Sequence, residues 1–428
     1  MTQNNSVFPS ALKLADITPT HKKDERTTKG NYRPVSILPS ASKVFERNMY
    51  DQIYLYVDKF LSPFLFGFRK GYSTQHCLMV MINKWNQAMD KGNFAGSLLT
   101  DLSKAFDCLN HELLIAKLEA YGFDNESLAY VYSYLSNRKQ RTKINTSLSE
   151  WADITTGVPQ GSILGPLLFN IYINDIFYFV NKCDLANYAD DTTPYTTDKS
   201  IDSLLKCLYE DTSILLKWFK DNYLKMNPDK CKLLISNRSK DISLLLENET
   251  IECSKSVKLL GIIIDNKLDF NEHVSNLCKT ISSKLHALAR ISNFICKNKL
   301  RLLMKSFIES QFDYCPVIWM FHSRLLNNRI NRLHERALRL VYKDSNLSFE
   351  ELLRKDESFT IHHRNLQKLA IEMYKAYKDL SPSLVKSIFP KRNIPYNLRN
   401  KNDFHSSNIN TVFNGMETIS FRGPKIWG

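Results

Sequence analysis

Tyr188-Ala189-Asp190-Asp191 is the stretch of this sequence that decides the fold, because it places two carboxylates side by side. A third acidic residue, Asp101, ends a separate short apolar run earlier in the chain. Like charges held a few ångströms apart oppose each other's ionisation unless a cation lies between them. Hard cations such as Mg²⁺ prefer carboxylate oxygens, and two such ions about 4 Å apart support nucleotidyl transfer. The three aspartates therefore predict a two-metal site, with a solvated Asp-Asp turn as the alternative.

Three further segments give the aspartates a context. Residues 97–101 read as an apolar strand that ends at Asp101, and a helix is expected from Asn110, a good N-cap, to Gly122, a good stop. Residues 157–166 (GVPQGSILGP) form a loop in which glycines allow close backbone approach and Gln160 offers both a donor and an acceptor. An ordinary turn is the alternative for this loop. Residues 217–232 predict a helix, a turn and a basic strand.

In this order the segments resemble the palm of a reverse transcriptase, specifically that of non-LTR retrotransposons (LINE elements) of the jockey-like kind. Residues 31–38 (NYRPVSIL) and 67–74 (GFRKGYST) resemble the fingers motifs of that family. Residues 259–262 (LLGI) resemble its primer-grip hairpin. The resemblance covers roughly residues 15 to 270 and continues into residues 285–319.

The resemblance implies an α+β right-hand polymerase with four parts. These are fingers over 1–94, a palm with an antiparallel sheet and the YADD hairpin over 95–270, a helical thumb over 271–345 and a C-terminal helical region over 346–428. A fingers insertion is expected near 123–156. Family members usually carry an upstream endonuclease that nothing here resembles, and the last residues look interrupted. We therefore expect a copy that is truncated at both ends.

The resemblance also assigns roles to residues around the acidic cluster. Asp101, Asp190 and Asp191 match the catalytic, metal-binding carboxylates, with Asp101 and Asp190 the expected direct ligands. The backbone carbonyl of Leu102 would complete the metal site. Phe106 matches the bulky residue that abuts the sugar 2′ position and rejects ribonucleotides. The implied cofactor is a pair of Mg²⁺ ions, with Mn²⁺ as a substitute.

Other residues match the pocket of the incoming nucleotide. Gln160 matches a residue that lines this pocket, and Lys22 or Lys23, with Arg33, falls where fingers residues grip the triphosphate. Lys230 is the candidate for a lysine that protonates pyrophosphate. Lys232 is its rival, and an exposed strand lysine is the alternative.

Two residues near the acidic motifs bear on structure. Asp107 is interpreted as structural, at a helix start. Pro194 falls where the returning strand of the catalytic hairpin should run. Proline lacks a ladder donor and is normally confined to edges or bulges. We therefore expect a short or bulged return strand.

Helical periodicity and basic residues point to contacts with nucleic acid. Helices are expected near 42–56, 75–89, 201–219, 274–288 and 325–342, and a basic hairpin near 137–141 should return to the fingers. The arginines of residues 325–342 recur every three or four positions and share a face that can line phosphates, with a solvated face as the alternative. The expected nucleic-acid contacts are Arg69, Gly261, Lys279, Lys284, Arg329, Arg332, Arg336 and Arg339.

The composition agrees with a nucleic-acid enzyme. Lys and Arg number 58 against 44 Asp and Glu, and the resulting net charge of +14 suits a polyanionic partner. Nine cysteines without a Cys-x-x-Cys pair argue against a zinc ribbon or a disulfide framework. Reduced thiols fit an intracellular protein of the cytoplasm or nucleus. No apolar run approaches the roughly 20 residues of a membrane span, and the polar first residues are no secretory signal.

The sequence thus predicts an RNA-directed DNA polymerase that uses an RNA template, a DNA primer and deoxynucleoside triphosphates. No protein partner is inferred. The alternative is a silent or domesticated relic that keeps the fold and only binds nucleic acid.

Overall fold

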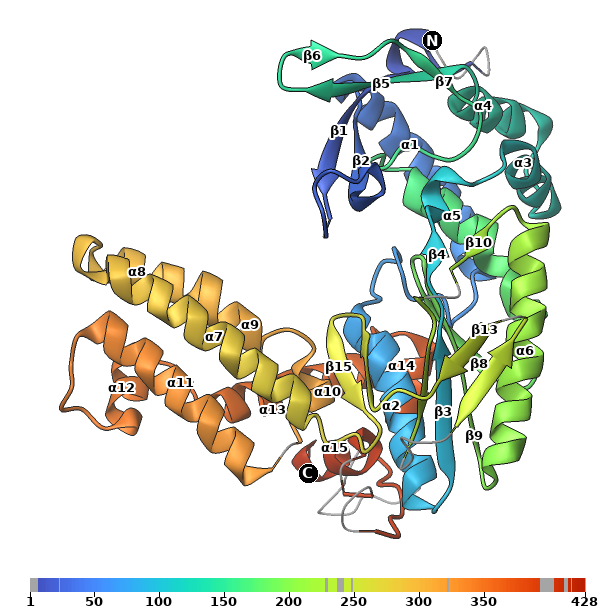
Figure 1. Ribbon diagram of the computed structural model, residues 1–428. Coiled ribbons are helices and arrows are strands. Elements are labelled where there is room, and N and C mark those ends of the chain that lie inside the picture. Colours follow the sequence, from blue (N-terminus) through green and yellow to red (C-terminus); the bar gives the residue numbers. More distant parts are fainter. Residues whose placement is uncertain are drawn as a thin grey trace.

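The computed structural model describes residues 7–22, 24–227, 230–236, 242–247, 249–321, 323–392, 404–411, 415–416 and 418–427 (Figure 1). Lys23, one of the two predicted triphosphate lysines, lies outside the described residues. At the centre is an antiparallel sheet in the order β11-β3-β9-β8. Its strands are β3 (Phe94–Leu99), β8 (Asp184–Tyr188), β9 (Asp191–Asp198) and β11 (Lys232–Ile235).

Two long helices, α2 (Thr74–Asp90) and α6 (Ile201–Asp221), cover opposite faces of this sheet (Figure 1). The apolar stripe expected over residues 201–219 is core packing, with Leu204, Leu208 and Leu215 fully buried. Gly96 of β3 lets α6 approach closely, because a methyl group there would lie 2.5 Å from a Leu204 methyl. The sheet is therefore enclosed between helices, and its strand ends are left to form a site.

Helix α2 packs on the central sheet and not on the other described elements of residues 1–94, with which the sequence grouped it. Residues 1–94 were expected to form the fingers together, yet α2 packs against β3, β8 and β9 and against helices near the C-terminus. The reason is that buried side chains lie on almost every side of this helix, including Leu78, Met81 and Trp85, which are at most 3% exposed, and the polar Asn83 and Asn86. A helix that is buried all round needs partners on every side.

The N-terminal part of the chain forms a second sheet in which β5 joins two early strands. In this sheet β2 (Tyr32–Ile37) pairs antiparallel with β1 (Leu14–His21), and β1 pairs parallel with β5 (Arg138–Ile144). The basic segment near residue 138 thus pairs with a strand of the N-terminal region. The surrounding elements are α1 (Ser40–Val57), α3 (His111–Ala120), α4 (Asn125–Leu135), α5 (Gly165–Ile173), β6 (Ser147–Leu148) and β7 (Ala152–Ile154).

The return strand of the catalytic hairpin is neither short nor bulged, so the expectation drawn from Pro194 was wrong. β9 runs over eight residues and pairs with β8 without interruption, with Pro194 opposite Leu185. The proline instead interrupts the pairing of β9 with β3, the strand on its other side. Continuous pairing with β3 ends at Ser97 and Tyr195 and resumes in the same register as a bridge between Thr100 and Thr192. The missing donor thus interrupts one ladder locally and leaves the register intact.

The second half of the chain is mostly helical. It follows two hairpins, the second of which turns at Leu260 and Gly261, both with positive φ. The helices expected near 274–288 and 325–342 are confirmed as α7 (Asn271–Ile291) and α11 (Arg324–Tyr342). The other elements here are β12 (Ser243–Leu246), β13 (Glu249–Glu252), β14 (Ser256–Leu259), β15 (Ile262–Asp265), α8 (Lys297–Met304), α9 (Ser310–Phe312), α10 (Pro316–Trp319), α12 (Phe349–Asp356), α13 (Ile361–Tyr377), α14 (Ser383–Ile388) and α15 (Ile419–Trp427).

The last described segments fold back onto α2. His76 Nε2 lies 3.0 Å from Glu372 Oε2 of α13, and Gln87 Nε2 donates to Ser420 Oγ of α15 over 3.1 Å. At the end of α2, the Asp90 carboxylate accepts backbone N–H groups of residues 410 and 411. In the described part of the chain, no helix combines the length and apolar character that crossing a bilayer requires.

Candidate active site

The pairing of β3 with β9 brings the acidic motifs together. Thr100 donates from both its backbone N and its Oγ1 to the carbonyl of Thr192, over 3.1 and 2.7 Å. The same antiparallel register, continued by one residue, sets Asp101 opposite Asp191. Two aspartates ninety positions apart in sequence therefore lie across from each other at one end of the sheet.

The turn that carries Asp190 is held from several directions. Ala189 has a φ of 59°, a left-handed conformation that costs free energy for a residue other than glycine. The buried Asn187 side chain donates to the Ala189 carbonyl over 3.0 Å and to Thr192 Oγ1 over 2.9 Å. A methyl group on Gly67 would collide with the backbone nitrogen of Ala189. Gly67, the first glycine of the GFRKGYST motif, therefore allows that segment to pack directly on the turn that carries Asp190.

The carboxylates at the strand ends influence one another. Burial, followed by the negative charges of Asp190 and Asp101, raises the pKa of Asp191 to about 6, and the positive charge of Lys22 acts in the opposite direction. Lys230 Nζ lies 2.9 Å from Asp101 Oδ2 in a half-exposed ion pair. Both lysines were singled out from the sequence, and both lie near the acidic cluster.

The donor chemistry at this end of the sheet suits hard divalent cations. Asp101 and Asp191 supply opposed carboxylates, and the carbonyl of Leu102 is directed away from β10 (Lys225–Met226). That direction follows because Asn227 N donates to Asp101 O over 2.9 Å, which makes Leu102 and Met226 a non-hydrogen-bonded pair. Within the described ranges, no three acidic, histidine or cysteine side chains are yet gathered as a metal site. Lys230 compensates part of the negative charge instead.

Phe106 and Gln160 lie on two segments that are fastened to each other. The Phe106 ring stacks on Phe169 with centroids 4.7 Å apart, and its carbonyl accepts the Val158 N–H over 2.9 Å. Gln160 Nε2 donates to Asp107 Oδ1 over 2.9 Å. Asp107 ends a short 3-10 turn and does not start a helix. Its bond to Gln160 was missed because the two residues are 53 positions apart in sequence.

Arg69 was expected to contact nucleic acid, but its side chain is only 5% exposed. The guanidinium pairs with Asp58 over 3.0 Å and donates to the carbonyl of Ser62 over 2.8 Å. It also lies over the Tyr72 ring, 4.3 Å from the centroid. We therefore interpret Arg69 as a residue that holds the loop between α1 and α2.

The other residues expected to contact nucleic acid differ in their availability. Arg339 donates to Glu335 Oε1 over 2.7 Å and also to the backbone carbonyls of Asp344 and Ser345, which follow α11. Arg329 donates to Ser275 Oγ of α7 over 3.2 Å. The remaining residues of the set are exposed or half-exposed, namely Arg332, Arg336, Lys279, Lys284 and Gly261, as is Arg33 of the expected triphosphate set. In Figure 1, α7 and α8 lie on the side of the helical half nearer the N-terminal sheet, and α11 lies on the far side.

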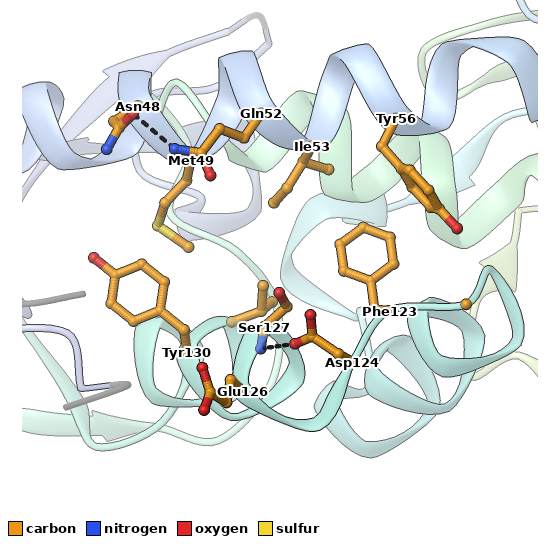
Figure 2. Close-up of a pocket in the computed structure, with 12 residues that line it drawn as sticks. Asn48, Met49, Gln52, Ile53, Tyr56, Phe123, Asp124, Glu126, Ser127 and Tyr130 are labelled. Atoms are coloured by element: carbon orange, nitrogen blue, oxygen red, sulfur yellow. Dashed lines mark hydrogen bonds between the residues drawn. The ribbon is translucent and has the colours of Figure 1, made fainter. Parts of the chain in front are cut away.

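A separate cavity of about 400 Å³ lies between α1 and α4. Figure 2 shows the α1 side chains facing residues at the start of α4 across this space. It shares no residue with the acidic cluster. Its lining consists of Asn48, Met49, Gln52, Ile53, Tyr56, Gly122, Phe123, Asp124, Glu126, Ser127, Tyr130 and Val131.

Comparison with known proteins identifies the class to which this fold and site belong. Residues 20–264 match the family described as "Reverse transcriptase (RNA-dependent DNA polymerase)". The match includes the three aspartates, Phe106 and Gln160. The chain belongs to the reverse transcriptase family.

Within this class, the chain is similar to polymerases of non-LTR mobile elements, as the motifs predicted. It is 30% identical over 352 residues to the "RNA-directed DNA polymerase from mobile element jockey" of Drosophila melanogaster, covering 78% of this chain and 38% of the relative. It is 28% identical to the "Probable RNA-directed DNA polymerase from transposon BS" of the same species, covering 78% and 39%. The chain thus spans well under half the length of these relatives.

Among solved structures, the chain is similar to telomerases. The apo telomerase of Candida tropicalis matches with a TM-score of 0.44 and 13% identity, covering 80% of this chain and 59% of that one. The telomerase of Candida albicans in complex with a fragment of telomeric RNA matches with a TM-score of 0.41 and 13% identity, covering 88% and 66%.

The contact between Gly67 and the turn that carries Asp190 leads to a prediction. Gly67→Ala should push the Ala189 backbone aside and slow primer extension by about ten- to a hundredfold, because small displacements of reacting groups are costly. Gly30→Ala is the matched control, since a methyl group there would meet nothing within 4 Å. Extension rates and thermal unfolding should be compared for both variants. Equal extension by the two would show that the close approach of Gly67 does not matter.

Proposed function

We propose that this chain extends a DNA 3′ end on an RNA template, using deoxynucleoside triphosphates. One observation carries the proposal, namely the β3–β9 register that sets Asp101 opposite Asp191 beside the turn of Asp190. The match to the reverse transcriptase family supports the same reaction. Acidic side chains converge there from two strand ends, as nucleotidyl transfer requires.

In this proposal, Asp101 and Asp190 hold a pair of divalent cations, with Asp191 and the Leu102 carbonyl assisting. The ions would be Mg²⁺, with Mn²⁺ as a substitute. When bound, they supply charge stabilisation for the attacking and leaving oxygens. Asp101 Oδ2 would hold a cation in place of its ion pair with Lys230. In this proposal the Lys230 ammonium lies close enough to the site to donate a proton to pyrophosphate.

The nucleotide lies between the two sheets in this proposal. Lys22, whose charge acts on Asp191, and Arg33 on the adjacent strand would hold the triphosphate. Phe106 would abut the sugar, because its ring is fixed by Phe169 and by the edge of Phe68, 5.9 Å away. Gln160 would contact the nucleotide with the part of its amide that Asp107 leaves open.

We further propose that α7 and the turn at Gly261 follow the template–primer duplex. Lys279 and Lys284 lie on α7, which is on the side of the helical half nearer the N-terminal sheet (Figure 1). Exposed Arg332 and Arg336 add backbone contacts if the duplex reaches α11. The reaction would take place in the cytoplasm or nucleus, where the nine cysteines stay reduced.

Replacing one carboxylate tests the reaction directly. Asp190→Asn should lower primer extension on an RNA template with Mg²⁺ by about 10²- to 10⁴-fold, since charge stabilisation worth several kcal/mol is lost. Binding of the duplex should be unchanged. Asp202→Asn, the same charge change at an exposed position of α6, is the control. Near-parental extension by Asp190→Asn would contradict the two-metal assignment. Parental protein that binds RNA–DNA duplex but never extends it would favour a silent, binding-only relic.

The position of the Phe106 ring gives a second test. Phe106→Val should increase incorporation of ribonucleotides relative to deoxyribonucleotides, because space opens for the 2′-hydroxyl. Phe106→Tyr keeps the ring and should keep the selectivity. Competition between labelled nucleotides measures the ratio. An unchanged ratio in Phe106→Val would remove this ring from the sugar pocket.

The salt dependence of duplex binding shows which of the basic helices, α7 or α11, contacts the nucleic acid. Each lost phosphate contact should reduce the slope of log affinity against log salt by roughly 0.7 to 0.9. We expect this reduction for Lys279→Ala, and for Arg332→Ala or Arg336→Ala only if the duplex reaches α11. Duplex affinity at several salt concentrations gives the slopes. Unchanged slopes in all three variants would make both helices solvated surfaces.

A further inference from the structure

We propose that Asp107 is a positioning residue, which fixes the orientation of the Gln160 side-chain amide and thereby the affinity for the incoming nucleotide. The inference rests on the proposed function, because it assigns Gln160 to the nucleotide pocket. Asp107 itself would not touch the nucleotide. It acts through the 2.9 Å bond from Gln160 Nε2 to its Oδ1.

Gln160 is held at both ends. Its backbone carbonyl accepts the N–H of Ser36 on β2 over 2.8 Å, while its side chain bonds the segment that follows Asp101. The main-chain bond fixes where the residue sits between the two sheets. The bond to Asp107 then fixes the remaining freedom, which is the direction of the amide group.

An ionised carboxylate can select one of the two amide orientations. Asp107 only accepts hydrogen bonds when it is charged, so it must face the NH₂ group of Gln160 and never the carbonyl oxygen. Gln160 Oε1 is therefore turned away from Asp107. An asparagine at position 107 can either donate or accept, so it would permit both orientations of the Gln160 amide.

The loop of residues 156–158 is held by main-chain atoms of the Asp107 segment and does not need the Asp107 side chain. Thr156 Oγ1 donates to the backbone carbonyl of Asp107 over 3.0 Å, and Val158 N donates to that of Phe106 over 2.9 Å. Gly157 lies so close that a methyl group would come within 2.7 Å of the Asp107 backbone. On the Asp107 side, these contacts involve only main-chain atoms of residues 106 and 107. Asp107→Asn, which has the same shape, leaves all of them in place.

A double-mutant cycle tests the inference. Nucleotide affinity is measured by titrating a deoxynucleoside triphosphate onto the protein with RNA template and a dideoxy-terminated DNA primer, which permits binding without turnover. Asp107→Asn should weaken nucleotide binding by about two- to tenfold, because only the molecules whose Gln160 amide keeps the required orientation then bind the nucleotide well. Gln160→Ala should weaken it at least as much. The double variant should be no weaker than Gln160→Ala alone, because Asp107 acts only through that amide.

Steady-state kinetics on an extendable primer give the second readout. In Asp107→Asn the change should fall on KM for the nucleotide and leave kcat and the unfolding temperature near the parental values. Additive effects in the cycle, or a loss confined to kcat or stability, would overturn the positioning role. A parental protein that neither binds the nucleotide nor extends a primer would instead refute the proposed function, and this inference with it.

Discussion

The register between β3 and β9 is the constraint on which the rest of the site depends. Side chains on neighbouring strands alternate between faces, so a slip of one residue would move Asp101 to the opposite face from Asp191. The register is maintained even where Pro194 removes a ladder donor, because pairing on either side of it is in phase. Uninterrupted pairing with β8 and close packing by α6 at Gly96 hold the strand from its other sides.

The acidic site is organised by compensation between charges that come from distant segments. Lys22 reaches it from the end of β1, and Lys230 from the segment before β11. Without the charge of Lys22, the pKa of Asp191 would rise further and that carboxyl would lose charge.

The sequence predicted what depends on local pattern. Helices with clear periodicity were recovered, because spacing determines them locally. The strand that leads to Asp101 was also recovered, although it ends at Leu99. The hairpin at Gly261 was expected only from the family resemblance. The family motifs supplied the order of the segments. Side-chain bonds across long separations, unlike the meeting of the acidic motifs, were not recoverable. The bond between Asp107 and Gln160 leaves no trace in either segment, and Arg69 looks the same in sequence whether its guanidinium meets a phosphate or Asp58.

The position of α2 has a consequence for how this chain reaches its native state during synthesis. The helix is complete by residue 90, but its bonds to α13 and α15 join positions 296 and 333 residues apart. At roughly 5–20 residues per second, ribosomes need on the order of 15 to 65 s to supply those partners. During that interval an apolar face of α2 is uncovered. The segments that carry α13 and α15 therefore complete the packing of a helix that was synthesised much earlier.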